Sequence, residues 1–447
     1  MKEKYSVKLE RVLSFIFKII LLLYLYFQSM VIFHNTVFIG IALWGLLLVG
    51  AVVCILRVFL YKSFVKTGGI ILLGLFLLSY AIAIFTNMEY GLNADIANWV
   101  ILALTFAVIY LQDVARDKNS VKKEMAFISK MYIVILDVSV LASLIMLVMA
   151  YGSVIYYDGY QLNIGFVENR LWGIFIDPNV ASVFSVVAII ISVYYIIQKR
   201  SRVFYGFTTA MLLFYIGVAD SRTGVLCLFF SIGFLSFMYA QKLITFFKKK
   251  VIHYLICFLL ALVIGGVSAS IPGVFQNGYN MIVSIEDPDN GNAKKIERNY
   301  NVSEDISNKR FAIWQSGIEI FSTKPLTGIG FHHLKDYVDQ ELPDTYLAQD
   351  GVRFSHLHNE ILNVLVSQGI IGLAIIVAFA VTSIVAIIKK YLTLDKNSFF
   401  EYTTMITCLL CICIGIMLQQ GILYFYMPIN LIFWMYLGYM RLDSRAK

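Results

Sequence analysis

Charged residues are scarce in this sequence. They occupy 14% of its 447 positions, whereas hydrophobic residues occupy 60%. Ordinary soluble domains carry roughly 25% charged residues, so the shortage excludes that class of protein. The apolar residues are gathered in runs long enough to cross the ~30 Å hydrocarbon core of a bilayer as helices. The sequence therefore predicts an integral membrane protein.

Polar metal ligands do not accompany the cysteines. All six cysteines lie inside apolar runs: Cys54, Cys227, Cys257, Cys408, Cys411 and Cys413. A structural zinc site needs four converging ligands. We interpret the cysteines as small apolar packing residues and expect neither a disulfide framework nor a metal site.

A signal-peptide cleavage site does not follow the first apolar run. The N-terminus has a basic head, but its apolar stretch continues to Phe33 and no small-x-small pattern comes after it. We therefore expect this run to be retained as the first membrane span.

The apolar runs predict twelve spans. They cover approximately residues 13–33, 37–56, 68–86, 96–112, 126–150, 178–198, 203–219, 222–240, 251–271, 370–388, 402–418 and 422–440. With a cytoplasmic N-terminus, the inward segments hold 24 of the 36 Lys and Arg, and the short outward loops hold only Arg170 and Arg222. This bias places both termini in the cytoplasm. The net charge of +8 follows from that topology beside an anionic inner leaflet, and it gives no reason to expect a nucleic-acid partner.

The spans divide the chain into three parts. Residues 1–271 hold spans one to nine, residues 272–369 form an extracytoplasmic loop with a histidine motif, and residues 370–447 hold the last three spans. The fold class is thus an all-α integral membrane protein with one large outer loop. The first half of that loop is polar and turn-rich without a sustained period, so we expect only local order there.

The second half of the outer loop predicts an amphipathic helix. Phe311, Trp314, Ile318 and Phe321 recur at helical spacing. Such a helix would lie along the outer membrane surface or against the bundle. Ser307 or Asn308 can cap its start and Pro325 closes its end.

Arginines and histidines gather on the predicted outward face. They are Arg170, Arg222, Arg310, His332, His333, His356 and His358. A hydrophobic bundle that places these groups away from its cation-rich side indicates that it handles an anion there.

Arg222 is the strongest anion-binding candidate. Its guanidinium can contact two phosphate oxygens at once, and Gly224 permits close approach. A local pair with Asp220 or interfacial snorkelling is the structural alternative. Arg310 lies in the first turn of the predicted helix, where an anion is favoured, although charges also commonly flank surface helices. Arg170 is either a contact to a lipid phosphate or substrate, or a solvated loop residue.

The histidines allow two interpretations. His356 and His358 form an H-x-H pair that His332, His333 or Glu360 could complete as a metal site. Because no characteristic metalloenzyme spacing occurs, we favour one neutral imidazole acting as a general base. Spacing alone does not identify which histidine has that role.

The segment "HNEILNVLVSQGIIG", with His358, Asn359, Gly369 and Gly372, resembles the motif of the O-antigen ligase and Wzy-type polysaccharide polymerase superfamily. The similarity extends in order through "FIDPNVAS", "SRTG" and "KRFAIWQSGIEIFSTKPLTGIG", and covers roughly residues 165–390. The first five spans add only a compatible topology.

The resemblance implies a GT-C-like, metal-independent inverting glycosyltransferase without a cofactor, acting on the outer face of the bacterial cytoplasmic membrane. It implies an undecaprenyl-diphosphate-linked glycan donor and a lipid-linked glycan acceptor, with His358 as the base and Arg222 and Arg310 on the diphosphate. Supporting or substrate-binding roles remain open for Arg170, His356, Asn359, Trp314, His332 and His333. Asn359 can instead cap the helix that begins at residue 360.

Three functions are compatible with this pattern. We favour a polymerase, which uses a second lipid-linked repeat unit as acceptor, and expect flippase and chain-length regulator proteins as possible partners. A ligase transferring the glycan to another acceptor shares the same motifs. A carrier of lipid-linked sugars is the alternative from another class, but it should place polar groups near the bilayer midplane. The clear charges inside the predicted spans are Lys18, Lys130 and Asp137.

Overall fold

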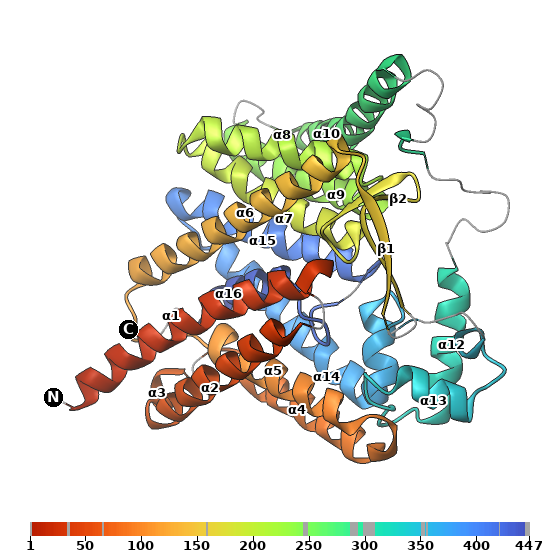
Figure 1. Ribbon diagram of the computed structural model, residues 1–447. Coiled ribbons are helices and arrows are strands. Elements are labelled where there is room, and N and C mark those ends of the chain that lie inside the picture. The colour runs from red at the N-terminus through yellow and green to blue at the C-terminus, as the bar shows by residue number, and fades with distance from the viewer. Residues whose placement is uncertain are drawn as a thin grey trace.

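Long apolar helices build the protein, which is mostly helical as predicted. The computed structural model describes residues 2–33, 36–64, 67–157, 160–244, 249–286, 294–297, 309–349, 354, 356–419 and 421–442. Both chain ends lie on one side of the molecule, and the β-strands with helices α12 and α13 lie on the other (Figure 1). This arrangement agrees with the predicted placement of both termini on one face.

The helices of the first half are α1 (Lys2–Gln28), α2 (Val37–Phe59), α3 (Tyr61–Phe64), α4 (Ile70–Phe85), α5 (Leu92–Leu104) with the π-helix η3 (Thr105–Tyr110), and α6 (Lys118–Val148). The later bundle helices are α7 (Pro178–Ile197), α8 (Arg202–Val218), α9 (Arg222–Leu243), α10 (Lys250–Glu286), α14 (Glu360–Tyr391), α15 (Lys396–Ile416) and α16 (Pro428–Arg441). Every predicted span overlaps one of these helices. Eight candidate spans are long and apolar enough to cross a membrane within the described ranges, and α4 and α8 are shorter apolar helices. The total of twelve spans stays a prediction.

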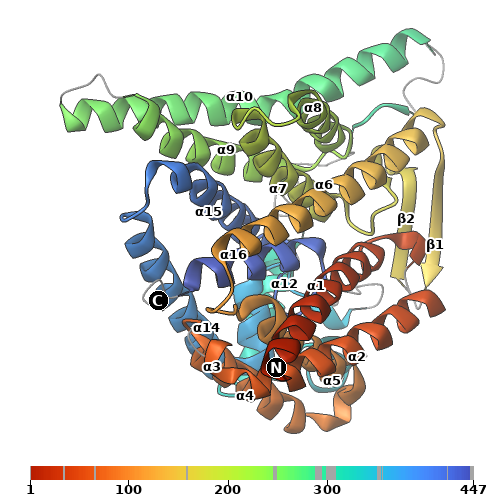
Figure 2. The same ribbon diagram turned by 90° about the vertical axis from the view of Figure 1, so that its left-hand side faces the viewer.

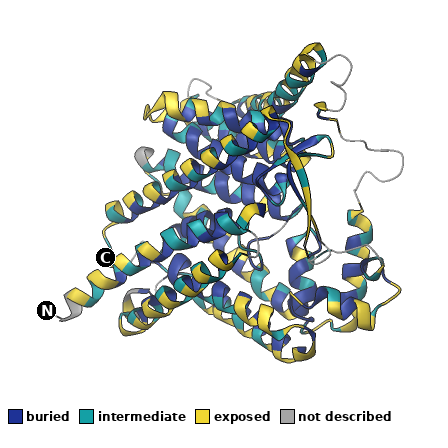
Figure 3. Cartoon of the chain, viewed as in Figure 1, coloured by how far each residue is buried: buried dark blue, intermediate teal, exposed yellow. Residues whose placement is uncertain are grey.

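The centre of the bundle is formed by α7 and α16. Most residues of α7 and every residue of α16 from Pro428 to Met440 are buried. Helices α8, α9 and α10 lie at one edge of the bundle and α1, α2, α4 and α5 at the opposite edge (Figure 2). Exposed residues follow the outer helices (Figure 3), including large apolar side chains such as Trp44 of α2 and Phe258 of α10. A helix that is apolar all round belongs in the interior, whereas these outer faces suit contact with lipid chains.

A three-stranded antiparallel sheet precedes α7 and was not predicted. It consists of β1 (Gly152–Tyr157), β2 (Tyr160–Val167) and β3 (Arg170–Gly173), in that order. The backbone after β3 is bonded to the end of α1: Val31 N donates to Ile174 O at 2.9 Å and Ile176 N donates to Ser29 O at 3.0 Å. These bonds fix the chain just before Asp177, the residue that caps α7.

A small second core lies outside the main bundle. It joins α12 (Arg310–Thr323), α13 (Leu334–Glu341), η2 (Met88–Tyr90), η4 (Tyr346–Ala348) and the start of α14. Its buried members are Tyr90, Ile313, Ile320, Ile329, Leu334, Tyr337, Val338, Leu347, Leu357 and Val366. The predicted outer loop therefore includes an ordered apolar cap beside the bundle.

The predicted amphipathic helix of the outer loop is present as α12. The inner face carries Ile313, Ser316, Gly317 and Ile320, whereas Phe311 and Ile318 are 68% and 55% exposed. Small residues on the inner face let α12 approach its neighbours closely. The proposed caps at residues 307 and 308 lie outside the described ranges.

Two further boundaries concern the same loop. Helix α10 continues through Pro272 to Glu286, so the expectation of irregular structure is wrong for its last turns. Helix α14 breaks at Gly369, which has φ 63° and ψ −166°. Ile370 N donates to Pro325 O at 2.9 Å across this break. A Cβ atom at Gly369 would lie 2.3 Å from the carbonyl group of Leu326, so glycine is required there.

Candidate functional site

His358 is held between α12 and the start of α14. The preceding residue, Leu357, is buried against Gly317 of α12. Trp314 Nε1 donates to Leu357 O at 3.0 Å, and Leu357 N donates to Asn363 Oδ1 at 2.9 Å. Trp314 thus fixes the backbone next to the imidazole, and His358 itself adopts a left-handed conformation with φ 50°.

Asn359 caps α14, as expected from the sequence. Its Oδ1 accepts from Leu362 N at 3.1 Å. Its Nδ2 donates to Met417 O at 3.4 Å, at the end of α15. Asn359 therefore orients the helix that follows His358.

Two charged residues act on the His358 imidazole from different elements. Asp177 is the N-cap of α7, accepting from Asn179 N at 2.7 Å, with Pro178 at the first helical position. Arg310 begins α12. Burial lowers the pKa of His358, Asp177 opposes that shift, and Arg310 adds to it. Burial raises the pKa of Asp177, while His358 and Arg310 oppose that rise. The motifs around residues 177, 310 and 358 therefore meet at one place.

Gln419 is a site residue that the sequence analysis missed. Its Nε2 donates to Thr223 Oγ1, in the first turn of α9, at 3.2 Å. Its side chain also raises the pKa of His358. Gln419 Oε1 and His358 Nδ1 are both buried and have no hydrogen-bond partner within the described part of the chain. The polar pair "QQ" between two apolar runs was the available signal in the sequence.

Glu360 fixes the turn that follows Gln419. Its Oε1 accepts from Ile422 N at 3.0 Å and from Leu423 N at 2.9 Å, and its Oε2 accepts from Asn363 Nδ2 at 3.3 Å. A Cβ atom at Gly421 would lie 1.6 Å from the carboxylate, so only glycine allows this approach. The carboxylate was considered in the sequence as a metal ligand, whereas its described bonds are to backbone and amide groups.

Arg222 lines a polar pocket at the start of α9. Ser221 caps this helix by accepting from Gly224 N at 3.1 Å. The pocket has a volume of about 600 Å³ and is also lined by Asp220, by Gln276 and Asn280 of α10, and by Lys295. Burial raises the pKa of Asp220 and Arg222 opposes the rise. The described contacts connect this turn to His358 through Thr223 and Gln419.

Arg170 is buried rather than solvated. It exposes 6% of its surface, and its guanidinium lies 5.0 Å from the centre of the Trp172 ring. Its Nε and Nη2 atoms have no hydrogen-bond partner among the residues that the structure describes. A buried donor left without an acceptor is unfavourable by about 1–3 kcal/mol, more when charged. The solvated-loop interpretation is therefore wrong, and an anionic ligand would relieve this situation.

His332 and His333 contact residues of α5 rather than His358. His333 Nε2 lies 3.2 Å from Asp95 Oδ2, with both side chains fully buried, and its Nδ1 lies 2.7 Å from Ile329 O. Asn98 Nδ2 lies 3.1 Å from His332 Nε2. Burial lowers the pKa of His332, and Asp95 opposes the shift. These histidines anchor the outer loop to the bundle, and the sequence analysis did not identify their partners.

His356 packs directly against His358. The two ring centres are 4.2 Å apart, and the centre of the Phe425 ring is 4.8 Å from that of His356. Burial lowers the pKa of His356 well below its ordinary value, and His358 adds to this shift. Throughout the described ranges, His, Cys, Asp and Glu form no group of three that could hold a metal ion. His356 is therefore a neutral packing partner of His358.

Replacing Glu360 should test whether its carboxylate positions the turn. We expect Glu360→Ala to lower the melting temperature clearly, because two buried N–H groups lose their acceptor at about 1–3 kcal/mol each. Glu360→Gln, which keeps an acceptor oxygen, should lose much less. Glu319→Ala on the outer face of α12 is the matched control, and equal losses for Glu360→Ala and Glu360→Gln would contradict the assigned role.

Comparison with known proteins gives a family match and a distant relative. The family model for the O-antigen ligases matches residues 207–377, which include α9, α10, α12 and the first part of α14. An uncharacterized protein of Haemophilus influenzae is 24% identical over 221 residues. That alignment covers 47% of this chain and 50% of the relative, so the chain spans about half the length of the relative. The family match confirms the resemblance inferred from the sequence motifs.

Proposed function

Because residues 207–377 belong to the O-antigen ligase family, we propose that this multi-pass membrane protein is a glycosyltransferase that polymerises undecaprenyl-diphosphate-linked oligosaccharide units on the outer face of the cytoplasmic membrane. The observation that supports this most is the meeting of His358 with Asp177, Arg310 and Gln419 from separate elements. It gives one base and one fixed cation in a buried setting, which suits transfer from a diphosphate donor.

In the proposed reaction His358 is the general base. Its lowered pKa leaves the imidazole neutral at pH 7 and able to accept a proton. The acceptor hydroxyl attacks the anomeric carbon, its proton passes to His358, and a new glycosidic C–O bond forms. The C–O bond to the lipid diphosphate breaks and the diphosphate leaves with the electron pair. Attack from the side opposite the leaving group inverts the anomeric centre.

Arginines stabilise the departing diphosphate in this proposal. Arg310 lies close enough to lower the pKa of His358, which supports a role for its guanidinium beside the leaving group. Arg222 faces the pocket of about 600 Å³ at the start of α9. Arg170, with its buried donors, supplies a third cation. Fixed charges in a site that excludes water act strongly on charge that develops during the reaction.

Gln419 is proposed to position the base. A neutral imidazole carries one N–H, and the hydrogen bond made by one ring nitrogen sets which nitrogen is free to accept a proton. Gln419 Oε1 is an acceptor within reach of His358 and has no other described partner. It would accept a hydrogen bond from Nδ1–H and leave Nε2 as the base. His356 keeps the ring in place from the other side.

Transfer to a different acceptor is the second candidate, because the matched family is described as O-antigen ligases. Purified protein supplied with a single lipid-linked repeat unit separates the two candidates. A ladder of longer glycans supports a polymerase. No product until another acceptor is added supports a ligase. Movement of the intact lipid-linked sugar across a vesicle membrane, without formation of a new glycosidic bond, would contradict both candidates and support a carrier.

His358→Ala should reduce glycan transfer by about 10²-fold or more, since a general base contributes roughly 10²–10⁴. The measurement is the rate of product formation by the purified variant, with its melting temperature as the check of folding. His253→Ala, in the first turn of α10, is the matched control and should keep the wild-type rate. Near-normal transfer by His358→Ala would remove this residue as the base.

Arg310→Lys and Arg222→Lys should each lose most activity. Lysine keeps the charge but lacks the planar pair of donors that contacts two phosphate oxygens. The same transfer assay applies, with Arg202→Lys at the exposed start of α8 as control. Wild-type turnover in either variant would leave that arginine with a topological role only.

Asp177→Asn should move the acid limb of the pH–rate profile to lower pH. Activity needs neutral His358, so it falls as the pH drops through the lowered pKa of this residue. Removing the carboxylate destabilises the imidazolium and lowers that pKa further, while asparagine still caps α7. The measurement is kcat/KM between about pH 4 and 8. An unchanged limb, or a shift to higher pH, would show that Asp177 does not act on the base.

A further inference from the structure

A groove lies between the N-terminal halves of α1 and α6, far from His358. Its volume is about 970 Å³ and its lining residues are Val7, Lys8, Arg11, Val12, Phe15, Arg116, Ser120, Lys123, Glu124 and Phe127. Residue Arg11 is 17 positions before Gln28, the end of α1 that approaches the candidate site. The separation along this helix is therefore roughly 25 Å. The groove lies on the side of the termini (Figures 1 and 2), which the topology prediction assigns to the cytoplasm.

The two walls of the groove are rigidly joined. Arg11 Nη2 lies 2.9 Å from Asp113 Oδ2, and Lys18 Nζ lies 2.6 Å from Glu124 Oε1. The Phe15 and Phe127 ring centres are 5.6 Å apart. These contacts set α1 and α6 side by side and keep the groove open between them.

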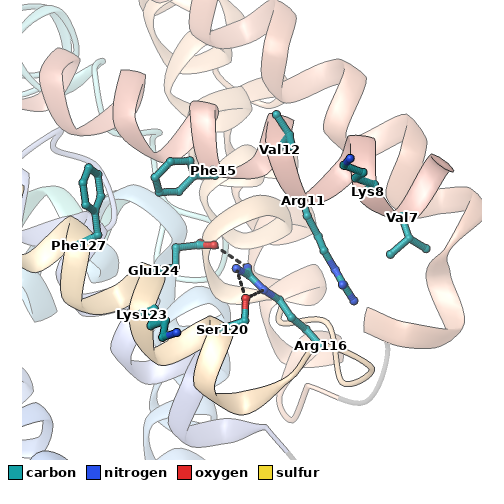
Figure 4. Close-up of a pocket in the computed structure, with 10 residues that line it drawn as sticks. All are labelled: Val7, Lys8, Arg11, Val12, Phe15, Arg116, Ser120, Lys123, Glu124 and Phe127. Carbon is teal, nitrogen blue, oxygen red and sulfur yellow. Dashed lines mark hydrogen bonds and ion pairs between the residues drawn. The ribbon is translucent and has the colours of Figure 1, made fainter. Parts of the chain in front are cut away.

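The charge of the groove is positive. Glu124 is the acidic residue of the lining, and both its oxygens are engaged, by Lys18 and by Arg116 at 2.6 Å each. Arg116 also donates to Ser120 Oγ, and Figure 4 shows these three side chains joined on one wall. Lys8 and Lys123 are exposed and have no ion pair within the described part of the chain. Among the described residues, Lys8 and Lys123 are thus the lining cations without a carboxylate partner, whereas Arg11 and Arg116 are paired.

Polar and apolar residues follow the same order along both walls. On α1, Lys8 and Arg11 precede Phe15, and on α6, Lys123 precedes Phe127. Phe127 is 46% exposed and Val12 is 48% exposed. A ligand that fills this groove therefore needs an anionic end beside the lysines and an apolar part along the rings.

We propose that this groove binds an anionic diacyl phospholipid, with the phosphate near Lys8 and Lys123 and an acyl chain along Phe15 and Phe127. A soluble anion would satisfy the cations but leave the apolar wall in water. A zwitterionic lipid would fill the groove without using its excess charge. The site is independent of the proposed glycosyl transfer.

Lipid retention measured by native mass spectrometry tests this site. The protein in detergent is titrated separately with phosphatidylglycerol, phosphatidylcholine of the same chains, and glycerol phosphate. We expect one phosphatidylglycerol to be retained at least tenfold more tightly than phosphatidylcholine, and glycerol phosphate not to compete at millimolar concentration.

The variant Lys8→Ala/Lys123→Ala should weaken phosphatidylglycerol binding on the order of tenfold or more, since each basic residue near an anionic surface contributes about fivefold. Lys250→Ala/Lys389→Ala removes two exposed lysines elsewhere and should bind normally. Equal weakening in both double variants would reduce the effect to general surface charge and overturn the site. Equal retention of phosphatidylcholine, or competition by glycerol phosphate, would also overturn it. The melting temperature of the Lys8→Ala/Lys123→Ala protein, measured in phosphatidylcholine, should match that of the wild type. Charge reversal by Lys8→Glu/Lys123→Glu should weaken phosphatidylglycerol binding further.

Discussion

The buried Glu360 carboxylate holds the candidate site together. It lies in the first turn of α14, where the helix dipole favours a negative charge. It exposes 4% of its surface, and its bonds run to the backbone of Ile422 and Leu423. His358 precedes it by two positions, and Gln419 and Phe425 flank the turn that it binds. His358, Gln419 and Phe425 are therefore held around the hydrogen bonds of one carboxylate.

The two ends of the molecule use charge in opposite ways. At the end with the termini, basic residues are numerous, and several are paired with buried carboxylates such as Glu10 and Glu124. At the other end, three arginines each begin an element: Arg170 begins β3, Arg222 begins α9 and Arg310 begins α12. A guanidinium in a fixed position can contact two phosphate oxygens at once, whereas many lysines attract an anionic surface.

Local sequence rules predicted the elements better than their contacts. The apolar runs gave the helices, and the side chain of Asn359 gave the cap of α14, because these features depend on neighbouring residues. The face of α12 that packs against the protein did not follow from its spacing, since apolar residues occur on more than one side and the choice depends on Leu357 fitting against Gly317. Asp95, Glu360 and Gln419 acquire their roles from residues 62 to 238 positions away, which no local pattern reveals. The sheet was missed because its strands are short and lie between two long apolar runs.

The left-handed backbone at His358 restricts how the site can be studied. Side chains branched at Cβ are strained at positive φ, whereas asparagine adopts this region readily. Asparagine has no group that titrates near neutral pH, so His358→Asn removes the proton acceptor of the proposed reaction while sparing the turn. Under that proposal, a lipid-linked donor binds beside Arg310 without being consumed. This substitution is therefore the natural choice for capturing an intact donor complex by cryo-electron microscopy.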